Sequence, residues 1–342
     1  MPYKANPKRY QKLIYRRSGN SGLLLPPITL GLWHNFGGKK SMPAESKKML
    51  FRAFDRGVTH FDLANNYGPP YGSAEINFGR LMNSDLRPFR DELIISTKAG
   101  YDMWPGPYGE WGSKKYLTAS LDQSLERLQI EYVDIFYSHR FDPLTPLEET
   151  ADALAQSVYQ GKALYVGISS YSSKQTIRMN KLLKERGISC LIHQPSYSML
   201  NRWIEKDLLK TLSKLGIGCI AFSPLAQGML SEKYLHKIPK NSRAAENSSL
   251  DKSKITKSYV KKIKGLSKIS NNRGQTISQL AIAWILRHKT MTSALIGSRT
   301  VKQLEECLDS LKNLKFSKFE LKQIDKFAKE EKINLWEPSS RY

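Results

Sequence analysis

The chain has 342 residues, of which 40% are hydrophobic, and its formal charge at neutral pH is +23. This length suits a single β/α barrel, which typically takes about 250 residues plus insertions, and the apolar content is enough for a sizeable core. No apolar run approaches the ~18 residues that a membrane-spanning helix needs, so we expect no membrane insertion.

The cysteines and the N-terminal segment indicate the compartment. Cys190, Cys219 and Cys307 are odd in number, far apart and without metal-ligand spacing. Residues 1–17 carry basic side chains but no continuous apolar stretch of the kind found in signal peptides. We therefore expect a reduced, cytoplasmic protein with no metal site.

The positive charge raises the question of nucleic-acid binding. Lysines occur in every segment and are densest in the Ser/Asn/Lys-rich stretch Lys233–Lys268. No helix-turn-helix, zinc-finger or RNA-binding motif accompanies them, so we interpret them as a solvated surface and expect no nucleic-acid partner. Nucleic-acid binding is the last-ranked alternative.

In chain order, a short hairpin is expected first, in Gln11–Leu25 around Gly19-Asn20 at the bottom of a barrel. Short apolar runs then alternate with amphipathic stretches, as in repeated βαβ units. The expected strands are Ile28–Leu32, Thr59–Leu63, Leu93–Thr97, Val133–Ser138, Ala163–Ile168, Cys190–His193, Cys219–Phe222 and Ser293–Ile296. The expected barrel helices are Ala44–Arg56, Ser73–Met82, Lys114–Leu128, Leu147–Tyr159, Ser173–Glu185, Ile204–Leu215, Ile277–Arg287 and Val301–Leu311.

Eight strands, each followed by a helix, favour an α/β fold of the (β/α)8 (TIM) barrel type over an open sheet. Residues 1–342 are expected to form a single domain. Within it, 233–254 is predicted to be a flexible insertion and Ile255–Ile269 an extra helix. A C-terminal helical extension is expected from Ser317 onward.

Four polar residues stand at or just beyond the ends of three consecutive expected strands: Asp62, Tyr67, Lys98 and His139. The carboxyl ends of barrel strands meet at one face, which holds the active site in barrel enzymes. An ammonium beside a phenol lowers the phenol pKa, so Lys98, held by Asp62, is expected to turn Tyr67 into a proton donor. His139 would orient a carbonyl oxygen, which makes carbonyl reduction the predicted chemistry.

Taken one at a time, each of these residues has an ordinary structural interpretation. An Asp–Lys pair is more often a plain salt bridge, and a histidine at a strand end is more often a satisfied core residue. Their joint occurrence at three successive strand ends favours catalysis. His60 and His193 are expected to lie inside strands, to face away from the site and to be structural.

A hydride donor is also required, and no Gly-x-Gly-x-x-Gly motif follows a strand. Barrels can hold phosphate in the loops after strands seven and eight, here 223–228 and 296–299, the second of which opens a helix whose amides favour an anion. Phe222 could stack on a nicotinamide ring, and Gln194 could bond its carboxamide. Taken alone, the segments 223–228 and 296–299 are equally well interpreted as ordinary loops.

Over about residues 10 to 335, the chain resembles the aldo-keto reductases. The matching motifs are Phe61–Gly68, Ser96–Gly100, Tyr137–Arg140, Gly167–Ser170 and Leu295–Ser298. Within that superfamily the chain is most similar to bacterial L-glyceraldehyde 3-phosphate reductases, which are relatives of potassium-channel β subunits. This closer likeness is carried by Gly31–Gly37, Tyr101–Gly109 and Asn334–Trp336.

The resemblance implies NADPH as cofactor, Tyr67 as general acid and Asp62, Lys98 and His139 as the rest of a catalytic tetrad. Lys233, Arg243 and Arg299 would meet the 2′-phosphate, which favours NADPH over NADH. The predicted substrate pocket consists of Trp33, Tyr67, Tyr101, Trp104 and His139. The predicted cofactor-binding residues are Trp33, Asp62, Ser169, Ser170, Gln194, Phe222, Ser223, Pro224, Leu225, Gln227, Gly228, Lys233, Arg243, Gly297, Ser298, Arg299, Gln303, Glu306 and Cys307.

Three positions depart from the family pattern near the cofactor. Cys307 stands where an adenine-binding Asn is usual, Glu232 replaces a common Gly, and Arg299 falls where Ser is expected. None of the three belongs to the tetrad.

Two functions therefore stand in order of preference. The first is an NADPH-dependent reductase of small aldehydes, such as L-glyceraldehyde 3-phosphate or methylglyoxal. The second is an NADP(H)-binding, redox-sensing subunit of a membrane channel that retains slow reductase activity. The resemblance also implies a homo-oligomer, a tetramer or larger.

Overall fold

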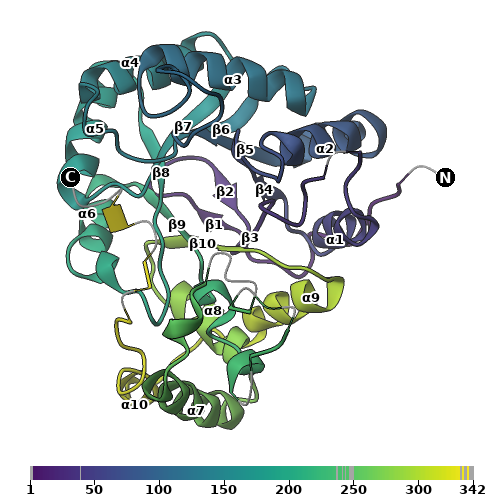
Figure 1. Ribbon diagram of the computed structural model, residues 1–342, viewed down its shortest axis with the longest axis vertical. Coiled ribbons are helices and arrows are strands. Elements are labelled where there is room, and N and C mark those ends of the chain that lie inside the picture. The colour runs from purple at the N-terminus through teal and green to yellow at the C-terminus, as the bar shows by residue number, and fades with distance from the viewer. Residues whose placement is uncertain are drawn as a thin grey trace.

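Eight parallel strands close into a barrel at the centre of the molecule (Figure 1). The computed structural model describes residues 3–38, 40–235, 238–240, 242, 244–245, 250–331, 333–334 and 337–338. Around the barrel the strand order is β10-β3-β4-β5-β6-β7-β8-β9. The strands are β3 (Ile28–Gly31), β4 (His60–Asp62), β5 (Ile94–Ala99), β6 (Val133–Ser138), β7 (Ala163–Ser169), β8 (Cys190–Gln194), β9 (Gly218–Phe222) and β10 (Met291–Ile296). The predicted (β/α)8 barrel is confirmed.

The predicted N-terminal hairpin is also present, with β1 (Arg16–Arg17) antiparallel to β2 (Leu24–Leu25). Leu25 is buried in one cluster with Ile135, Leu191 and Ile220, which come from three barrel strands. Gly19 has a φ of +54°, and a Cβ there would lie 2.0 Å from the carbonyl oxygen of Gly216. The turn therefore needs glycine to approach the barrel this closely.

Helices surround the barrel and pack against it through buried apolar side chains, on one face for most of them and nearly all round for α8 (Ile277–Leu286) (Figure 1). Several begin at side-chain caps: Ser113 accepts from the Tyr116 amide, and Ser172 with Gln175 forms a capping box. The α-helices are α1 (Ala44–Asp55), α2 (Ser73–Leu81), α3 (Lys114–Leu128), α4 (Leu147–Tyr159), α5 (Ser173–Glu185), α6 (Leu208–Leu215), α7 (Lys257–Asn272), α8 (Ile277–Leu286), α9 (Val301–Asp309) and α10 (Lys318–Ile324).

The predicted extra helix and C-terminal helix are α7 and α10, which lie side by side at the lower edge of Figure 1. Gly265 of α7 permits the close approach, because a Cβ there would lie 2.4 Å from the ring of Phe327. Arg202 fixes the following segment by donating to the Ala328 carbonyl at 2.7 Å and to Asp325 at 2.8 Å.

Some of the sequence-based predictions fall outside the described residues. Of the predicted insertion 233–254, the structure describes 233–235, 238–240, 242, 244–245 and 250–254. Arg243, Leu335 and Trp336 also lie outside the described residues. In the part of the chain that is described, no helix combines the length and the apolar character required to cross a bilayer.

Candidate active site

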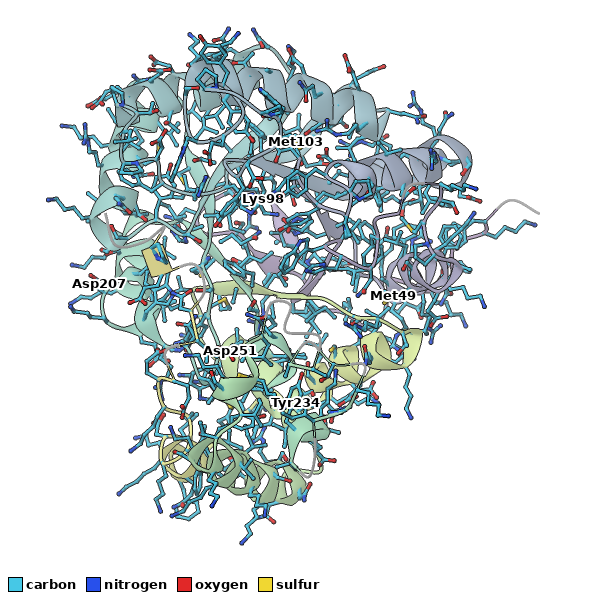
Figure 2. The ribbon with its side chains drawn as sticks, in the orientation of Figure 1. Met49, Lys98, Met103, Asp207, Tyr234 and Asp251 are labelled. Carbon is cyan, nitrogen blue, oxygen red and sulfur yellow. The ribbon has the colours of Figure 1, made fainter. Side chains whose placement is uncertain are left out.

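The four predicted catalytic residues meet at the carboxyl ends of neighbouring strands. Asp62 ends β4, Lys98 is the penultimate residue of β5, and His139 directly follows β6. The Lys98 ammonium lies 2.5 Å from Asp62 Oδ2 and 3.5 Å from the Tyr67 hydroxyl. Figure 2 shows Lys98 near the middle of the molecule, where the strands converge.

Asp62 and Lys98 form an ion pair with no exposed side-chain surface. Lys98 Nζ also donates to the Leu63 carbonyl at 2.5 Å. The other carboxylate oxygen, Asp62 Oδ1, accepts from Ser96 Oγ at 2.8 Å and from Gln194 Nε2 at 3.1 Å. Such a buried pair is tolerated because hydrogen bonds satisfy both ions.

Burial sets the protonation of the site. It raises the pKa of Tyr67 well above the ordinary tyrosine value, and the Asp62 charge raises it further. The net shift of the Tyr67 pKa is therefore upward, not downward as we expected, because the desolvation of a phenolate outweighs the stabilisation that the ammonium can give. Burial, with the Lys98 and Arg140 charges, lowers the pKa of His139 well below the usual value. At neutral pH the site thus holds a neutral phenol and a neutral imidazole.

Aromatic rings surround the phenol and the imidazole. The Tyr67 and His139 ring centroids are 6.0 Å apart, and Tyr101 meets His139 edge-on at 4.7 Å. Trp33 lies 6.2 Å from Tyr67. Trp104 instead packs against Tyr116 at 5.1 Å and is not part of the wall of the adjoining cavity.

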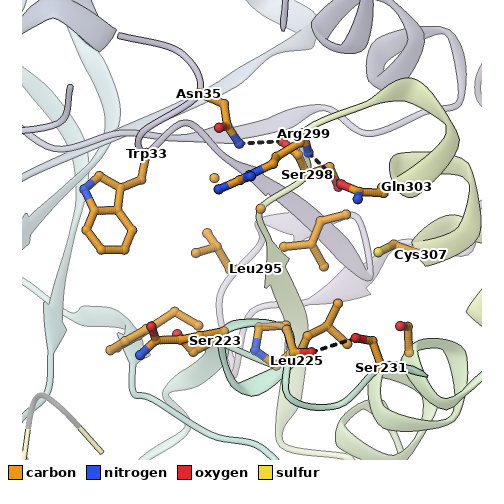
Figure 3. Close-up of a pocket in the computed structure, with 18 of the residues that line it drawn as sticks. Trp33, Asn35, Ser223, Leu225, Ser231, Leu295, Ser298, Arg299, Gln303 and Cys307 are labelled. Atoms are coloured by element: carbon orange, nitrogen blue, oxygen red, sulfur yellow. Dashed lines mark hydrogen bonds between the residues drawn. The ribbon is translucent and has the colours of Figure 1, made fainter. Parts of the chain in front are cut away.

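A cavity of about 850 Å³ opens over these residues and continues towards α9. Most of the residues predicted for the substrate and cofactor sites line it, and Figure 3 shows several of them. The predicted residues that line it are Trp33, Tyr67, Tyr101, His139, Ser169, Ser170, Gln194, Phe222, Ser223, Pro224, Leu225, Gln227, Gly228, Lys233, Gly297, Ser298, Arg299, Gln303, Glu306 and Cys307. Asp62 and Lys98 lie buried beneath its floor.

Several cavity residues had no predicted role. Asn35 donates to the Ser298 carbonyl at 2.9 Å and so joins the loop after β3 to the loop after β10 (Figure 3). Asn66 lies on the cavity wall next to Tyr67. It belongs to the motif Phe61–Gly68, in which only Asp62 and Tyr67 were predicted to act. The other lining residues without a predicted role are Gly31, Ser231, Thr276, Ile277, Ser278 and Leu295, and the cavity also includes Glu232 and Ile296 from segments predicted to lie near the cofactor. The Thr276–Gln279 capping box marks where α8 starts, but not that this start faces the cavity.

The backbone of the cavity wall is strained at several places. Ser170, Ser223 and Gln227 all line the cavity, and all have φ between 55° and 59°, in the left-handed region that non-glycine residues rarely adopt. Strained residues of this kind concentrate at functional sites. They support the same location for the site independently of its chemistry.

His60 corrects one sequence-based expectation. We expected it to face away from the site, yet it shares a strand face with Asp62, because residues two apart in a strand point the same way. Its ring bonds Thr29 Oγ1 at 3.0 Å and Ser96 Oγ at 2.9 Å, and Ser96 in turn contacts Asp62. His193 has a different partner, the Tyr171 carbonyl, at 3.1 Å.

The cavity has groups that suit a dinucleotide. Lys233 and Arg299 supply positive charge, and Phe222 presents a ring. Gln227 Oε1 is a buried oxygen with no hydrogen-bond partner. The amides at the start of α9 are partly engaged, because Arg299 N–H donates to Gln303 and Val301 N–H donates to Glu45.

Several polar groups of the cavity already have partners within the chain. Gln194 Nε2 bonds Asp62, and the Ser169 hydroxyl donates to the Gln194 carbonyl at 2.8 Å. Cys307 is buried, which raises its pKa to about 12, so its thiol stays protonated. Among the residues that the structure describes, no group of three or more His, Cys, Asp or Glu could hold a metal ion.

Comparison with known proteins gives a consistent result. The model of the Aldo/keto reductase family matches residues 27–329. Two proteins named L-glyceraldehyde 3-phosphate reductase, from Escherichia coli strain K12 and from Escherichia coli O157:H7, are each 55% identical over 345 residues, covering 99% of this chain and of their own. A probable voltage-gated potassium channel subunit beta from Oryza sativa subsp. japonica is 33% identical over 304 residues, which cover 87% of this chain and 90% of its own. The chain therefore belongs to the aldo/keto reductase family of oxidoreductases.

Proposed function

We propose that this protein reduces small aldehydes with NADPH and that Tyr67 is the general acid. The observation that carries the proposal is the buried line from Asp62 through Lys98 to the Tyr67 hydroxyl, 2.5 Å and then 3.5 Å long, at the floor of the cavity. A phenol supported by an ammonium at this position can protonate a carbonyl oxygen.

Reduction adds a hydride to the carbonyl carbon and a proton to the carbonyl oxygen. When bound, the reduced nicotinamide supplies a hydride to the carbonyl carbon. The π pair of the C=O bond moves to oxygen, which takes the proton from the Tyr67 hydroxyl as that O–H bond breaks. The phenolate that results lies 3.5 Å from the Lys98 ammonium, and at an effective dielectric constant of about 20 their attraction is about 5 kcal/mol.

Tyr67 therefore holds its proton until negative charge develops on the substrate oxygen. Burial keeps the phenol neutral in the resting protein, and the nearby Lys98 ammonium limits the cost of forming the phenolate when the proton is transferred. His139, also neutral, lies within the same aromatic wall, and its Nδ1 has no hydrogen-bond partner. Its imidazole can orient the carbonyl without competing as a charged acid.

Family members typically use NAD(P)H, and we propose NADPH for this chain because Lys233 and Arg299 line the far part of the cavity. Charge-assisted contacts from these two residues to a 2′-phosphate would favour NADPH over NADH. Glu232 lies on the same wall and would oppose them, so the net preference is smaller than two cations alone would give.

For the substrate, we propose small aldehydes that include L-glyceraldehyde 3-phosphate. The support is the 55% identity, over the full length, to reductases named for that compound. The cavity adds a polar group suited to a hydroxylated aldehyde, since Asn66 Oδ1 is buried at its wall and has no partner.

The decisive experiment measures oxidation of NADPH by purified protein with L-glyceraldehyde 3-phosphate, D-glyceraldehyde 3-phosphate and methylglyoxal. The Tyr67→Phe variant removes only the hydroxyl, so we expect turnover to fall by roughly 10²- to 10⁴-fold while NADPH binding is kept. Unchanged turnover of Tyr67→Phe would show that another group donates the proton. No turnover of L-glyceraldehyde 3-phosphate would contradict the proposed substrate, and the rate with the D-enantiomer shows how far the site selects between the two.

A second function is favoured by the 33% identity to the rice protein named as a probable channel subunit. A redox-sensing subunit would need the same tetrad but little turnover. Steady-state turnover well above one per second would contradict a sensor, whereas one slow turnover with retained NADP would contradict the metabolic reductase. The predicted homo-oligomer stays a proposal that analytical ultracentrifugation would test.

A further inference from the structure

A continuous line of buried polar side chains crosses the inside of the barrel to reach Asp62. It starts at Ser293 of β10, passes through Thr29 of β3 and His60 of β4, and ends at Ser96 of β5. The links are 2.8 Å from Ser293 Oγ to Thr29 Oγ1, 3.0 Å from Thr29 Oγ1 to His60 Nδ1, 2.9 Å from His60 Nε2 to Ser96 Oγ and 2.8 Å from Ser96 Oγ to Asp62 Oδ1. All five side chains have no exposed surface.

The direction of every hydrogen bond follows from the carboxylate at the end. The Asp62 carboxylate can only accept, so the Ser96 hydroxyl must donate its one hydrogen to Asp62. Ser96 Oγ must then accept the hydrogen bond from His60 Nε2–H. His60 is neutral, because burial lowers its pKa to about 4, so its Nδ1 accepts the hydrogen bond that the Thr29 hydroxyl donates. Thr29 then accepts from Ser293. Every donor points towards Asp62.

We propose that Ser96, His60 and Thr29 are positioning residues of the reductase site, which orient the Asp62 carboxylate so that Oδ2 holds Lys98 against Tyr67. The proposal rests on the proposed function. Asp62 Oδ1 accepts hydrogen bonds from Ser96 and Gln194, which leaves Oδ2 to accept the hydrogen bond from Lys98. None of the three proposed positioning residues lines the cavity, so each acts through Asp62 rather than on substrate or cofactor.

The Ser96 hydrogen bond also weakens the effect of the Asp62 negative charge on Tyr67. The Asp62 carboxylate raises the Tyr67 pKa, and a hydrogen bond to Oδ1 withdraws part of that negative charge. The other titratable groups around the carboxylate are Lys98 from β5, His60 from β4 and Tyr137 from β6. Loss of the Ser96 donor should therefore move the pKa of the acid upward and loosen the Asp62–Lys98 geometry.

The chain offers a matched control on the same strand. Thr97 Oγ1 donates to the Glu75 carboxylate at 2.5 Å, and neighbouring residues of a strand face opposite sides. Ser96→Ala and Thr97→Val thus each delete one buried strand hydroxyl that donates to a carboxylate, but only the first carboxylate belongs to the site. His60→Gln, whose amide can still donate to Ser96, is paired with His60→Leu, which cannot.

The test measures kcat, KM for the aldehyde and the pH dependence of kcat/KM with NADPH. For Ser96→Ala we expect kcat to fall about 10- to 100-fold, the size of losing one hydrogen bond to a charged group. For His60→Leu, which removes a bond to the neutral Ser96 hydroxyl, we expect a fall of about 3- to 10-fold, and for both variants KM should stay within about twofold. The alkaline limb of the profile should move to higher pH. Thr97→Val should keep the wild-type profile, and His60→Gln should recover most of the kcat lost in His60→Leu. A wild-type profile for Ser96→Ala or His60→Leu would overturn the proposal.

A second readout needs no turnover. In wild-type protein with ¹⁵N-labelled histidine, His60 should be the Nε2–H tautomer and stay neutral down to about pH 5, with its signal assigned by its loss in His60→Gln. An Nδ1–H tautomer or a charged ring at neutral pH would reverse the chain and refute the proposal, even if Ser96→Ala fails to fold. A wild-type protein that turns over no aldehyde would refute the proposed function instead.

Discussion

Replacing Lys98 by Met tests the central ion pair, because Met keeps the length of the side chain and deletes the charge. The Coulomb attraction of about 5 kcal/mol between ammonium and phenolate would be lost. At 1.36 kcal/mol per tenfold, a fully formed phenolate implies about a 3,000-fold loss of kcat, and a half-formed one about 50-fold. We therefore expect kcat to fall between these limits.

The same change should destabilise the fold. Without Lys98 the Asp62 carboxylate is buried and keeps only Ser96 and Gln194 as partners. Removing one member of a buried pair costs about 3–5 kcal/mol, and the two remaining donors place the expected loss at the lower end.

Two measurements complete the test of Lys98. Urea unfolding gives the change in free energy of unfolding, and NADPH oxidation gives kcat. Lys181→Met is the control, since Lys181 is exposed in its pair with Glu185 and should change stability by less than about 1 kcal/mol. The Asp62→Asn and Lys98→Met double variant should recover stability but not activity. A loss of kcat below fivefold in Lys98→Met would refute the proposed support of Tyr67.

Three further predictions concern packing, pH and the cofactor. Gly167→Ala should destabilise the protein by about 1–3 kcal/mol in urea unfolding, since its Cβ would lie 2.6 Å from the Tyr137 ring, whereas Gly22→Ala, with open space around it, should change stability by less than about 0.5 kcal/mol. Burial lowers the pKa of His193 in the folded protein to about 3, so its contribution to the free energy of unfolding is full above about pH 6.5 and is lost as the pH falls towards that pKa. When the pH is lowered from 7 to 5, the free energy of unfolding should therefore fall by about 2 kcal/mol less in His193→Gln than in wild type. Arg299→Ala should weaken NADPH binding about 10- to 100-fold in fluorescence titration and leave NADH binding within about threefold, and equal weakening of both would place Arg299 away from the 2′-phosphate.

Local signals in the sequence were sufficient for most of the barrel. Helices Lys114–Leu128, Leu147–Tyr159 and Ser173–Glu185 have the predicted bounds, because their apolar period is clear and two of them begin at a serine cap. The helix expected at Ile204–Leu215 begins only at Leu208. A 3₁₀ turn at Trp203–Glu205 precedes it, held by the Trp203 indole donating to the Ser196 carbonyl at 2.8 Å, a contact that periodicity does not reveal.

The site divides in the same way. Polar residues at strand ends could be placed together because parallel strands in a barrel end at one face, and Asp62, Lys98 and Tyr67 are in contact as expected. Asn35 and Thr276 could not be found, since they reach the cavity through loop paths that only the folded chain defines. The direction of the Tyr67 pKa was missed for a related reason, because the degree of burial is a tertiary property.

The polar line through the barrel follows from a conflict between stability and chemistry. A buried carboxylate and ammonium are expensive to desolvate, and apolar residues of the same volume would often make a more stable core. The site needs the ammonium beside Tyr67, so the fold must satisfy the carboxylate that holds it. Besides Lys98, the carboxylate receives donors from Ser96 and Gln194, and Ser96 is in turn held by an imidazole and hydroxyls from β4, β3 and β10 inside the barrel. A network in which every polar group has its hydrogen bonds is also rigid. Tyr67 requires this rigidity, because its position depends on Lys98 and, through Lys98, on Asp62.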